Sequence, residues 1–341
     1  MTRGARLRAL LQAGVALYLA AVAVIAVLLC AFADAFWPAT LLAFGPRWIW
    51  GAPLVVLVPA ALAAGDRRRR LLAALAVAAA IWVGPILDLR LPVARLGRLG
   101  LTRDLRVMTY NIGGGEMDPE ALRAQVRELG PDLFAVQERS FPFAGKGIPA
   151  MPYSGSCGSE QCLWSRFPIT STDARDPADL LARHGSGSIA LYQVRSPRGP
   201  LRVLNVHLAT VREGVASVMQ RAFRGVPALE ENTRERALES EIARAYADRG
   251  SGSLLVMGDF NLPVESAIYR RSWGSLPNAL SETGFGLVST KHTRWHGVRI
   301  DHVLAGPGWQ VLRAWVGPGL GGDHRPVLAD LHWAGTTPDP G

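Results

Sequence analysis

The segment VMGDFNLP, residues 256–263, places a carboxylate and an amide at the end of an apolar run. The run Leu254–Met257 predicts a buried strand, and Asp259 and Asn261 follow it directly after Gly258. Burying polar groups without partners is costly, so two of them at the end of a core strand need a reason. One reason is a turn, because Gly, Asp, Asn and Pro are typical turn residues. The other is an active site at the edge of a sheet.

The same pattern recurs at the ends of other apolar runs in the last two thirds of the chain. Polar residues of the kinds that enzymes use end or follow these runs at Asn111, Glu138, His207, Asp301 and Asp323–His324. Each of them alone is more typical of a solvated strand end or a turn. Six such ends in one domain are difficult to explain as six independent turns. We therefore interpret them as one site, assembled where several strands end.

In chain order these residues lie in the motifs TYN, QE, NVHL, GDFN, IDHV and GDHRPV. Their order and spacing resemble the endonuclease/exonuclease/phosphatase superfamily, which includes DNase I-like nucleases, abasic-site endonucleases, inositol-polyphosphate 5-phosphatases and neutral sphingomyelinases. The resemblance extends over residues 105–333, and GDFN and the final Asp-His pair are its most specific parts. It implies a four-layer α/β/β/α sandwich, the DNase I-like fold, and a metal-dependent phosphoester hydrolase.

Phosphoester hydrolysis needs a cation that offsets charge on the phosphoryl oxygens, an oriented water, and donors for the developing negative charge. The residue types present can supply each part, and the resemblance implies the same roles. Glu138 is a hard oxygen ligand suited to Mg²⁺, with Mn²⁺ as an alternative. Asn111 and Asp323 are expected to bind the same ion or to contact its ligands.

The remaining residues of the predicted site act on the water and the phosphate. Asp259 is expected to hold and deprotonate the attacking water, and Asn261 to orient that water or bind phosphate. His207 and His324 are expected to donate to phosphoryl oxygens or to assist the leaving group. Asp301 is expected to fix and charge the ring of His324, as in the carboxylate–imidazole pairs of other hydrolytic sites.

Short β-rich runs with a few helices between them must position these residues. Strands are predicted at 105–112, 131–138, 188–194, 201–208, 253–260, 299–305 and 326–331, and helices at 118–130 and 232–250. Many strands with few helices favour a layered α/β domain in which two β-sheets pack between helices. His302 follows Asp301 on its strand and should point to the opposite face, so we leave it out of the site.

The basic excess of the chain sits in its apolar N-terminal third. Residues 1–100 hold 11 Arg and 3 Asp, a net charge of +8, whereas residues 101–341 hold 26 basic and 25 acidic residues, a net charge of +1. Uncharged runs at 9–33, 48–65 and 71–87 predict three transmembrane helices, because a helix of this kind can cross a hydrocarbon core of about 30 Å. For the second and third runs the alternative is a hydrophobic hairpin lying in the interface. The first is too long for the usual signal peptide.

Arginines flank the predicted spans. Three precede the first run, at positions 3, 6 and 8, and Arg67–Arg70 fill the turn between the second and the third. The positive-inside rule places both groups in the cytoplasm, so three crossings leave everything after residue 90 on the other side. We therefore predict a multi-pass protein of the cell (inner) membrane with a periplasmic or extracytoplasmic catalytic domain.

Cys157 and Cys162 are the only cysteines outside the apolar third. Their proximity in sequence is compatible with a disulfide, which suits an oxidising compartment, and two unpaired thiols are the alternative. A metal site at this position is not favoured, because no second Cys or His pair lies nearby.

The predicted organisation is a membrane anchor at 1–90, a linker at 91–103, a catalytic domain at 104–335 and a flexible tail at 336–341. Within the catalytic domain, residues 211–231 lie between NVHL and a charged helix. Their apolar positions Val215, Val218, Met219 and Phe223 indicate a lid, a membrane-touching stripe, or ordinary core packing of a helix.

The predicted substrate follows from charge and location, because the superfamily does not fix it. DNA-binding domains usually carry a basic footprint, and residues 101–341 are nearly neutral. A membrane-anchored domain outside the cytoplasm favours a membrane-proximal phosphodiester, phosphomonoester or pyrophosphate, such as a lipid headgroup or a polyprenyl pyrophosphate. The layout resembles membrane-anchored bacterial relatives. A nuclease acting on extracytoplasmic DNA or RNA is the first alternative, and a non-catalytic binding module is the second.

Overall fold

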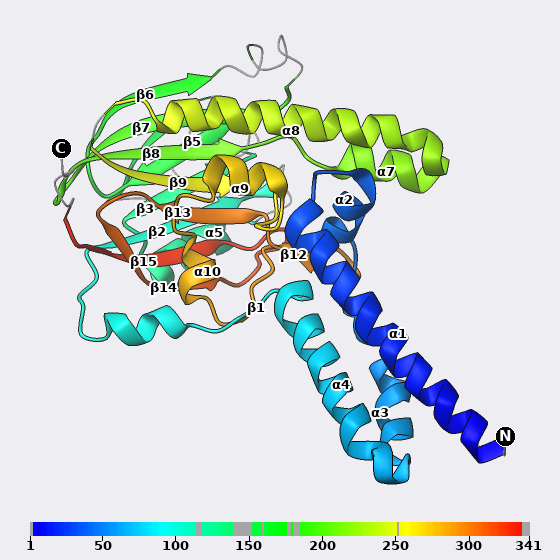
Figure 1. Cartoon of the computed structure of the whole chain (residues 1–341). Helices are drawn as coiled ribbons and strands as arrows, with labels where there is room; N and C mark the ends of the chain where they lie inside the picture. Colours follow the sequence, from blue (N-terminus) through cyan, green and yellow to red (C-terminus); the bar gives the residue numbers. More distant parts are fainter. Residues whose placement is uncertain are drawn as a thin grey trace, which may run out of the picture. The chain divides into compact units, whose positions relative to one another are not determined.

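The structure, a computed structural model, describes residues 3–113, 118–138, 152–158, 160–175, 179, 185–250 and 252–335 (Figure 1). The predicted tail at 336–341 lies outside the described residues. The chain divides into two compact units. The N-terminal unit comprises Met1–Leu89 with Glu265–Ala267, and the sandwich unit comprises Arg90–Val264 and Ile268–Gly341.

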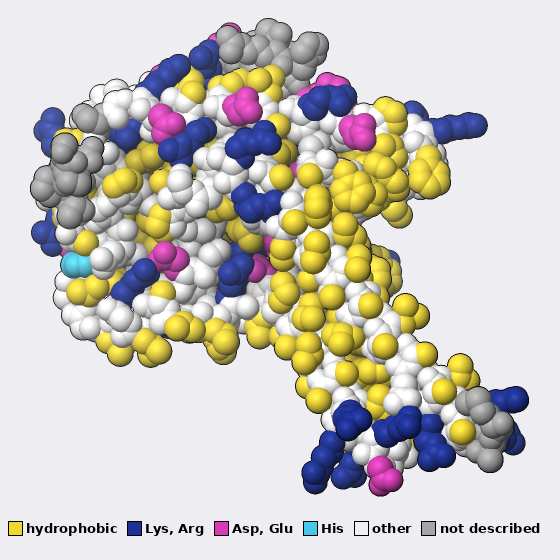
Figure 2. Space-filling view, viewed as in Figure 1, with side chains coloured by type: hydrophobic (Ala, Val, Ile, Leu, Met, Phe, Trp, Pro, Cys, Tyr) yellow, Lys and Arg dark blue, Asp and Glu magenta, His cyan; other side chains and the backbone are white. Residues whose placement is uncertain are grey.

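The N-terminal unit is helical because its long uncharged runs are rich in strong helix formers such as Ala and Leu. Its helices are α1 (Arg3–Phe32), α2 (Trp37–Phe44), η1 (Arg47–Gly51), α3 (Leu54–Leu62), η2 (Gly65–Arg67), α4 (Arg68–Ile81) and η3 (Trp82–Ile86). Val22 and Leu29 of α1 are buried in one apolar cluster with Leu71 and Leu75 of α4. Figure 2 shows hydrophobic side chains over the outside of these helices and cationic side chains gathered at the end where the chain begins.

Two helical segments are long and apolar enough to cross a membrane, Arg3–Phe32 and Gly65–Ile86. The pair Trp37–Phe44 and Arg47–Leu62 meets the same requirements together but is bent by 90°, so it is either a broken span or a re-entrant segment. Membrane association through two or three helices is therefore compatible with the structure.

The sandwich unit contains two large β-sheets. The five-stranded sheet has the order β13-β9-β8-β7-β6, and the six-stranded sheet has the order β14-β15-β2-β3-β5-β4. The bounds of the first sheet are β6 (Ile169–Arg175), β7 (Ser188–Ser196), β8 (Gly199–His207), β9 (Ser253–Asp259) and β13 (Asp301–Ala305). Those of the second are β2 (Leu105–Asn111), β3 (Leu133–Gln137), β4 (Ser154–Gly158), β5 (Gln161–Ser165), β14 (Trp309–Val316) and β15 (Val327–Trp333).

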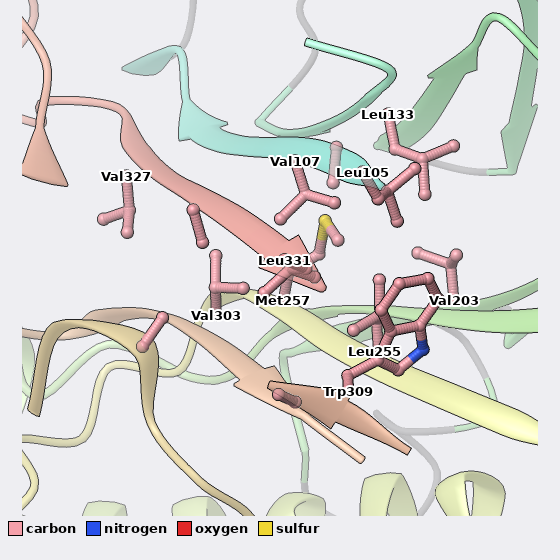
Figure 3. Packing of buried hydrophobic residues seen from close by; sticks show 14 of the residues in the cluster. Leu105, Val107, Leu133, Val203, Leu255, Met257, Val303, Trp309, Val327 and Leu331 are labelled. Carbon is pink, nitrogen blue, oxygen red and sulfur yellow. The ribbon is translucent and has the colours of Figure 1, made fainter. Parts of the chain in front are cut away.

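The main core lies between the two sheets, where side chains from both inner faces meet (Figure 3). Val107 and Leu133 come from the six-stranded sheet, and Val203, Leu255 and Met257 from the five-stranded sheet. Alternate residues of a strand face opposite sides, so each strand contributes every second residue to this core. Burial of this apolar surface is the main stabilising term of the sandwich.

Helices cover the outer faces of both sheets. On the six-stranded sheet, α5 (Pro119–Leu129) buries Leu122 and Val126 against Met108 and Tyr110 of β2. On the five-stranded sheet, α8 (Val226–Ala247) and α9 (Ala267–Trp273) share one apolar cluster with β8 and β9. The remaining elements are β1 (Leu89–Arg90), η4 (Val93–Arg98), α7 (Arg212–Arg221), η7 (Ala222–Gly225), α10 (Ala279–Thr283), β10 (Gly286–Leu287), β11 (Lys291–His292) and β12 (Gly297–Val298). The predicted mixed α/β fold with two packed sheets is confirmed.

Two parallel strand pairs bring the polar strand ends to one end of the sandwich. In the pair β2–β3, Asn111 lies opposite Gln137, the residue before Glu138. In the pair β8–β9, His207 lies opposite Asp259. Strand β13 runs antiparallel to β9 and begins at Asp301, which also lies opposite Asp259. The ends of β2 and β3 in one sheet meet the ends of β8 and β9 and the start of β13 in the other, because Asn111 Nδ2 donates to Asp259 Oδ2 between the sheets.

The strands and helices predicted after residue 104 agree with the structure to within a few residues, apart from one helix. The helix predicted at 232–250 begins at Val226 instead, because Pro227 occupies its first turn, where a missing backbone N–H has no cost. The predicted linker at 91–103 contains the short helix η4. Cys157 and Cys162 form a disulfide and lie opposite each other in the β4–β5 pair.

Candidate active site

Asp259 is the centre of the polar cluster at the end of the sandwich, and it is only 1% exposed. One carboxylate oxygen, Oδ1, accepts a bond from the backbone N–H of Asn261 at 2.9 Å. The other, Oδ2, accepts a bond from Asn111 Nδ2 at 3.0 Å. Gly258 is required just before it, because its φ is +145° and a Cβ there would lie 1.9 Å from the carbonyl oxygen of Val206.

Asn261 fixes the loop that follows His207. Its φ of +47° is a left-handed conformation that Asn tolerates better than most residues. Its side-chain Nδ2 donates to the carbonyl oxygen of Leu208 at 2.8 Å. The side chain is therefore engaged with the backbone next to His207, and its predicted role at the water or the phosphate stays a prediction.

His324 lies between two carboxylates. Its Nδ1 donates to Asp301 Oδ2 at 2.9 Å, and its Nε2 lies 3.5 Å from Asp259 Oδ2. Burial disfavours the charged imidazole, but Asp301 and Asp259 outweigh burial and raise the pKa of His324 to about 9. The two carboxylates therefore favour the protonated ring, as the predicted pairing with Asp301 requires.

Lys291 on β11 is a member of the site that the sequence reasoning missed. Its Nζ lies 2.8 Å from His324 Nε2 and 3.1 Å from Asp323 Oδ2. Because the Lys291 charge opposes that of the His324 ring, it lowers the pKa that the two carboxylates raise. The chain contains two lysines and 35 arginines, so the choice of lysine at position 291 could have marked that residue as a candidate for the site.

Asp323 is placed by ion pairs. Its carboxylate contacts Lys291 and, at 3.5 Å, Nη2 of Arg212, and its side chain is 43% exposed. It belongs to neither of the two groups of possible metal ligands among the described residues. Its predicted role as a metal ligand stays a prediction.

One of these two groups is made of Glu138, His207 and Asp259, whose ligand atoms lie within 4.8 Å of one another. Nε2 of His207 is 3.4 Å from Glu138 Oε1 and 4.0 Å from Asp259 Oδ2. Asn111 Nδ2 donates to Glu138 Oε1 at 2.9 Å and so links the two carboxylates. Glu138 has a φ of +54°, a strained conformation for this residue type that is typical of functional sites.

The second group is made of Asp259, Asp301 and His324. Both ring nitrogens of His324 already have partners, because Nδ1 contacts Asp301 Oδ2 at 2.9 Å and Nε2 contacts Lys291 Nζ at 2.8 Å. The Glu138 group is therefore the better candidate for a cation.

Glu239 on α8 supports the site from behind and was also missed. It is 2% exposed, and its carboxylate accepts three backbone N–H bonds, from Ser186 at 2.5 Å, Gly187 at 2.6 Å and Ala209 at 2.5 Å. Burial raises the pKa of Glu239 although these bonds oppose the shift. The carboxylate ties the start of β7 and the loop after His207 to one helix. Because Glu239 lies in a charged run, the sequence pattern predicts an exposed position on the helix.

His302 lies away from the cluster, as its position on the strand predicted. Its Nε2 contacts the carbonyl oxygen of Leu262 at 2.8 Å, and its Nδ1 contacts Asn278 at 3.1 Å. Its ring packs edge-on against Phe260. These contacts make His302 part of the core under α9.

A family model for the endonuclease/exonuclease/phosphatase family matches residues 108–324, a span that contains every residue of this cluster. The chain belongs to the endonuclease/exonuclease/phosphatase family. Members of this family are phosphoester hydrolases that generally depend on a divalent metal, although some are non-catalytic. The carboxylates of Glu138 and Asp259 are oxygen ligands of the kind that hard divalent cations prefer, so this group fits the metal that the family implies.

Solved structures show the same fold. An endonuclease/exonuclease/phosphatase from Beutenbergia cavernae matches at 19% identity and a TM-score of 0.50, covering 69% of this chain and 73% of that chain. A humanized form of Danio rerio TDP2 matches at 12% identity and a TM-score of 0.51, covering 67% of this chain and 98% of that chain. Comparison with curated protein sequences gives no match.

Proposed function

We propose that this chain is a membrane-anchored, Mg²⁺-dependent phosphoester hydrolase that acts on a membrane-proximal phosphate ester or pyrophosphate. The observation that carries the proposal is the position of Asp259. It belongs to one group of possible metal ligands with Glu138 and His207, and its Oδ2 also lies 3.5 Å from Nε2 of His324. A phosphate bound beside Asp259 would therefore meet a cation site and a proton donor together.

Asp259 is the residue that would orient and deprotonate the attacking water. Burial opposes its charge, but His324, His207 and Lys291 outweigh burial and hold its pKa below the usual value. The carboxylate is therefore ionised at neutral pH and can hold a water through a charge-assisted hydrogen bond. As the water attacks phosphorus, its proton passes to an oxygen of Asp259, and the bond between phosphorus and the leaving oxygen breaks.

Three other side chains supply positive charge and positioning. The His324 imidazolium, held by Asp301, would donate to a phosphoryl oxygen or protonate the leaving group. Lys291 would donate to a second phosphoryl oxygen when it turns from His324 toward substrate. Glu138, with His207 and Asn111 beside it, would hold Mg²⁺, which when bound offsets negative charge on the phosphoryl oxygens.

The proposed location rests on the arginine pattern of the N-terminal unit. Three crossings, with the bent pair Trp37–Phe44 and Arg47–Leu62 as the second, would place residues beyond 90 outside the cytoplasm. The disulfide between Cys157 and Cys162 supports the same side of the membrane. A phosphatase-type reporter fused after residue 100 should be active in intact cells, and an inactive fusion would contradict this orientation.

The substrate class is tested with the full chain in detergent micelles containing Mg²⁺. The panel compares phospholipids, a polyprenyl pyrophosphate and plasmid DNA, each with and without EDTA. We expect EDTA-sensitive hydrolysis of a lipid-linked substrate and little cleavage of DNA. Preferential cleavage of DNA would establish the nuclease alternative, and binding without hydrolysis of any substrate would establish the binding module.

A further inference from the structure

The α7–α8 hairpin presents two large apolar side chains to solvent at its tip. Met219 at the end of α7 and Phe223 in η7 are each 78% exposed. Val218, beside Met219, is buried, so this stretch divides into a core-facing side and a solvent-facing side. Single exposed apolar residues are normal on protein surfaces, but two large ones close together at a protruding tip mark an interaction site.

The tip has a fixed shape rather than a loose one. Gly225 packs so tightly that a Cβ there would lie 2.2 Å from the carbonyl oxygen of Ser217, and a Cβ on Gly214 would lie 2.8 Å from Leu229 Cδ1. The two helices therefore approach closely only because glycine occupies both positions. Ala222, between Met219 and Phe223, has a φ of +48°, a strained conformation for alanine that ends α7 and turns the chain. Strain of this kind persists where the surroundings enforce it.

Both charged residues of the tip, Arg221 and Arg224, are positive. Arg221 and Arg224 are exposed, and neither has a carboxylate partner within the described part of the chain. From Gly214 to Leu229 the sequence contains no Asp or Glu. Figure 2 shows hydrophobic side chains gathered over the α7 end of the hairpin. Apolar side chains flanked by arginines match the interface of a bilayer with anionic headgroups, where the rings and chains enter and the guanidinium groups bind phosphate.

We propose that residues 219–224 form a membrane-insertion tip, with Met219 and Phe223 entering the interfacial region of a bilayer and Arg221 and Arg224 contacting anionic headgroups. The tip lies far in sequence from the candidate spans, so it is a second membrane contact. Arg212, at the start of the same helix, contacts Asp323 at the edge of the active site. The hairpin therefore connects a membrane-bound tip to the catalytic cluster. The inference rests on the anchoring in the proposed function, but not on the reaction.

The test uses the full chain with Cys30→Ser, so that one introduced cysteine can carry the environment-sensitive fluorophore NBD. Gln220→Cys reports on the tip and leaves Met219 and Phe223 in place, and Gln310→Cys, an exposed position on β14, is the matched control. Each protein is reconstituted into phosphatidylcholine vesicles with or without phosphatidylglycerol. Vesicle flotation measures anchoring, and quenching by doxyl-labelled lipids measures insertion of the label.

We expect the label at 220 to be quenched at least several-fold more than the label at 310. Met219→Ser with Phe223→Ser should abolish the difference, and Arg221→Gln with Arg224→Gln should reduce it only in vesicles with phosphatidylglycerol. Flotation with equal quenching at 220 and 310 would overturn the insertion tip alone. A blue-shifted but unquenched label at 220 would place the tip against protein, in the same chain or a second copy of it, and would overturn the insertion tip too. Failure to float would reject the anchoring, and the insertion tip with it.

Discussion

Asp301 lies directly opposite Asp259 in the antiparallel pair of β13 and β9, and the ring of His324 contacts both carboxylates. Two buried carboxylates at neighbouring positions would repel each other, and an imidazolium between them offsets that repulsion. The two acids have different partners, because Asp259 shares a group of possible metal ligands with Glu138 and His207, whereas the Asp301 carboxylate accepts a bond from Nδ1 of His324. This difference assigns Asp259 to the water and Asp301 to the ring.

Asp301→Asn should move the alkaline limit of activity to lower pH. The amide keeps the shape of the side chain but removes the charge that holds the proton on His324, whose pKa is about 9 in the native protein. A raised folded-state pKa means that the protonated form prevails at neutral pH and is lost as pH rises through that value. A pH profile of kcat between about pH 6 and pH 10 checks this shift. An unchanged alkaline limit would remove Asp301 from its assigned role.

Lys291→Met should shift the same limit in the opposite direction. The Lys291 charge lowers the pKa of His324, so its removal should let the ring keep its proton to higher pH. The rate at neutral pH should fall about 100-fold if Lys291 donates to a phosphoryl oxygen. Lys291→Arg keeps the charge and serves as the matched variant for the pH profile. A lower alkaline limit in Lys291→Met would contradict the arrangement of charges described above.

Glu239→Gln should destabilise the sandwich unit by about 1–3 kcal/mol, because an amide cannot accept all three backbone bonds of the carboxylate. The thermal unfolding midpoint measures the effect. Glu241→Gln, an exposed position on the same helix, is the control and should leave the midpoint unchanged. Because Glu239 ties the loop after His207, kcat should also fall while KM changes little. Equal midpoints for the two variants would show that the three bonds contribute nothing.

Glu138→Gln should weaken stabilisation by divalent metal. A ligand that binds only the folded state stabilises it, by about 2.7 kcal/mol at a ligand concentration of a hundred times its Kd. This stabilisation raises the unfolding midpoint. Added Mg²⁺ or Mn²⁺ should therefore raise the midpoint of the native chain and raise that of the variant much less. The same measurement on Asp323→Asn tests whether Asp323 is also a ligand. A reduced metal-induced shift would make it one, and an unchanged shift would not. The same metal-induced shift in Glu138→Gln and in the native chain would place the cation elsewhere.

The strand ends of the site could be predicted from sequence because each strand carries its own apolar run up to the polar residue. Asn111, His207 and Asp259 are predicted in this way. Parallel pairing of β8 and β9 places His207 beside Asp259, and packing of the two sheets brings Asn111 to Asp259. Hydrophobic patterning cannot find Lys291, because its strand β11 has only two residues. The contact between Lys291 and His324 depends on an isolated β-bridge between these two residues, which no local pattern predicts.

Glu239 illustrates a different limit of sequence reasoning. It lies in a charged helical run, where most acidic residues are exposed, and only the packing of α8 against the ends of β7 and β8 buries it. The segment 211–231 shows the same limit. The sequence pattern is compatible with either a buried or an exposed position for its apolar residues. In the structure Val218 is buried, whereas Met219 and Phe223 are exposed.

The central claim is metal-dependent hydrolysis with Asp259 as the residue that acts on water. The most direct measurement is turnover of bis-p-nitrophenyl phosphate by the full chain and by Asp259→Asn, each in Mg²⁺ and in EDTA. We expect turnover by the native chain in Mg²⁺ that EDTA abolishes, and a loss of at least about 1,000-fold in Asp259→Asn with an unchanged unfolding midpoint. Turnover that persists in EDTA, or a folded Asp259→Asn that retains nearly the native rate, would contradict the account.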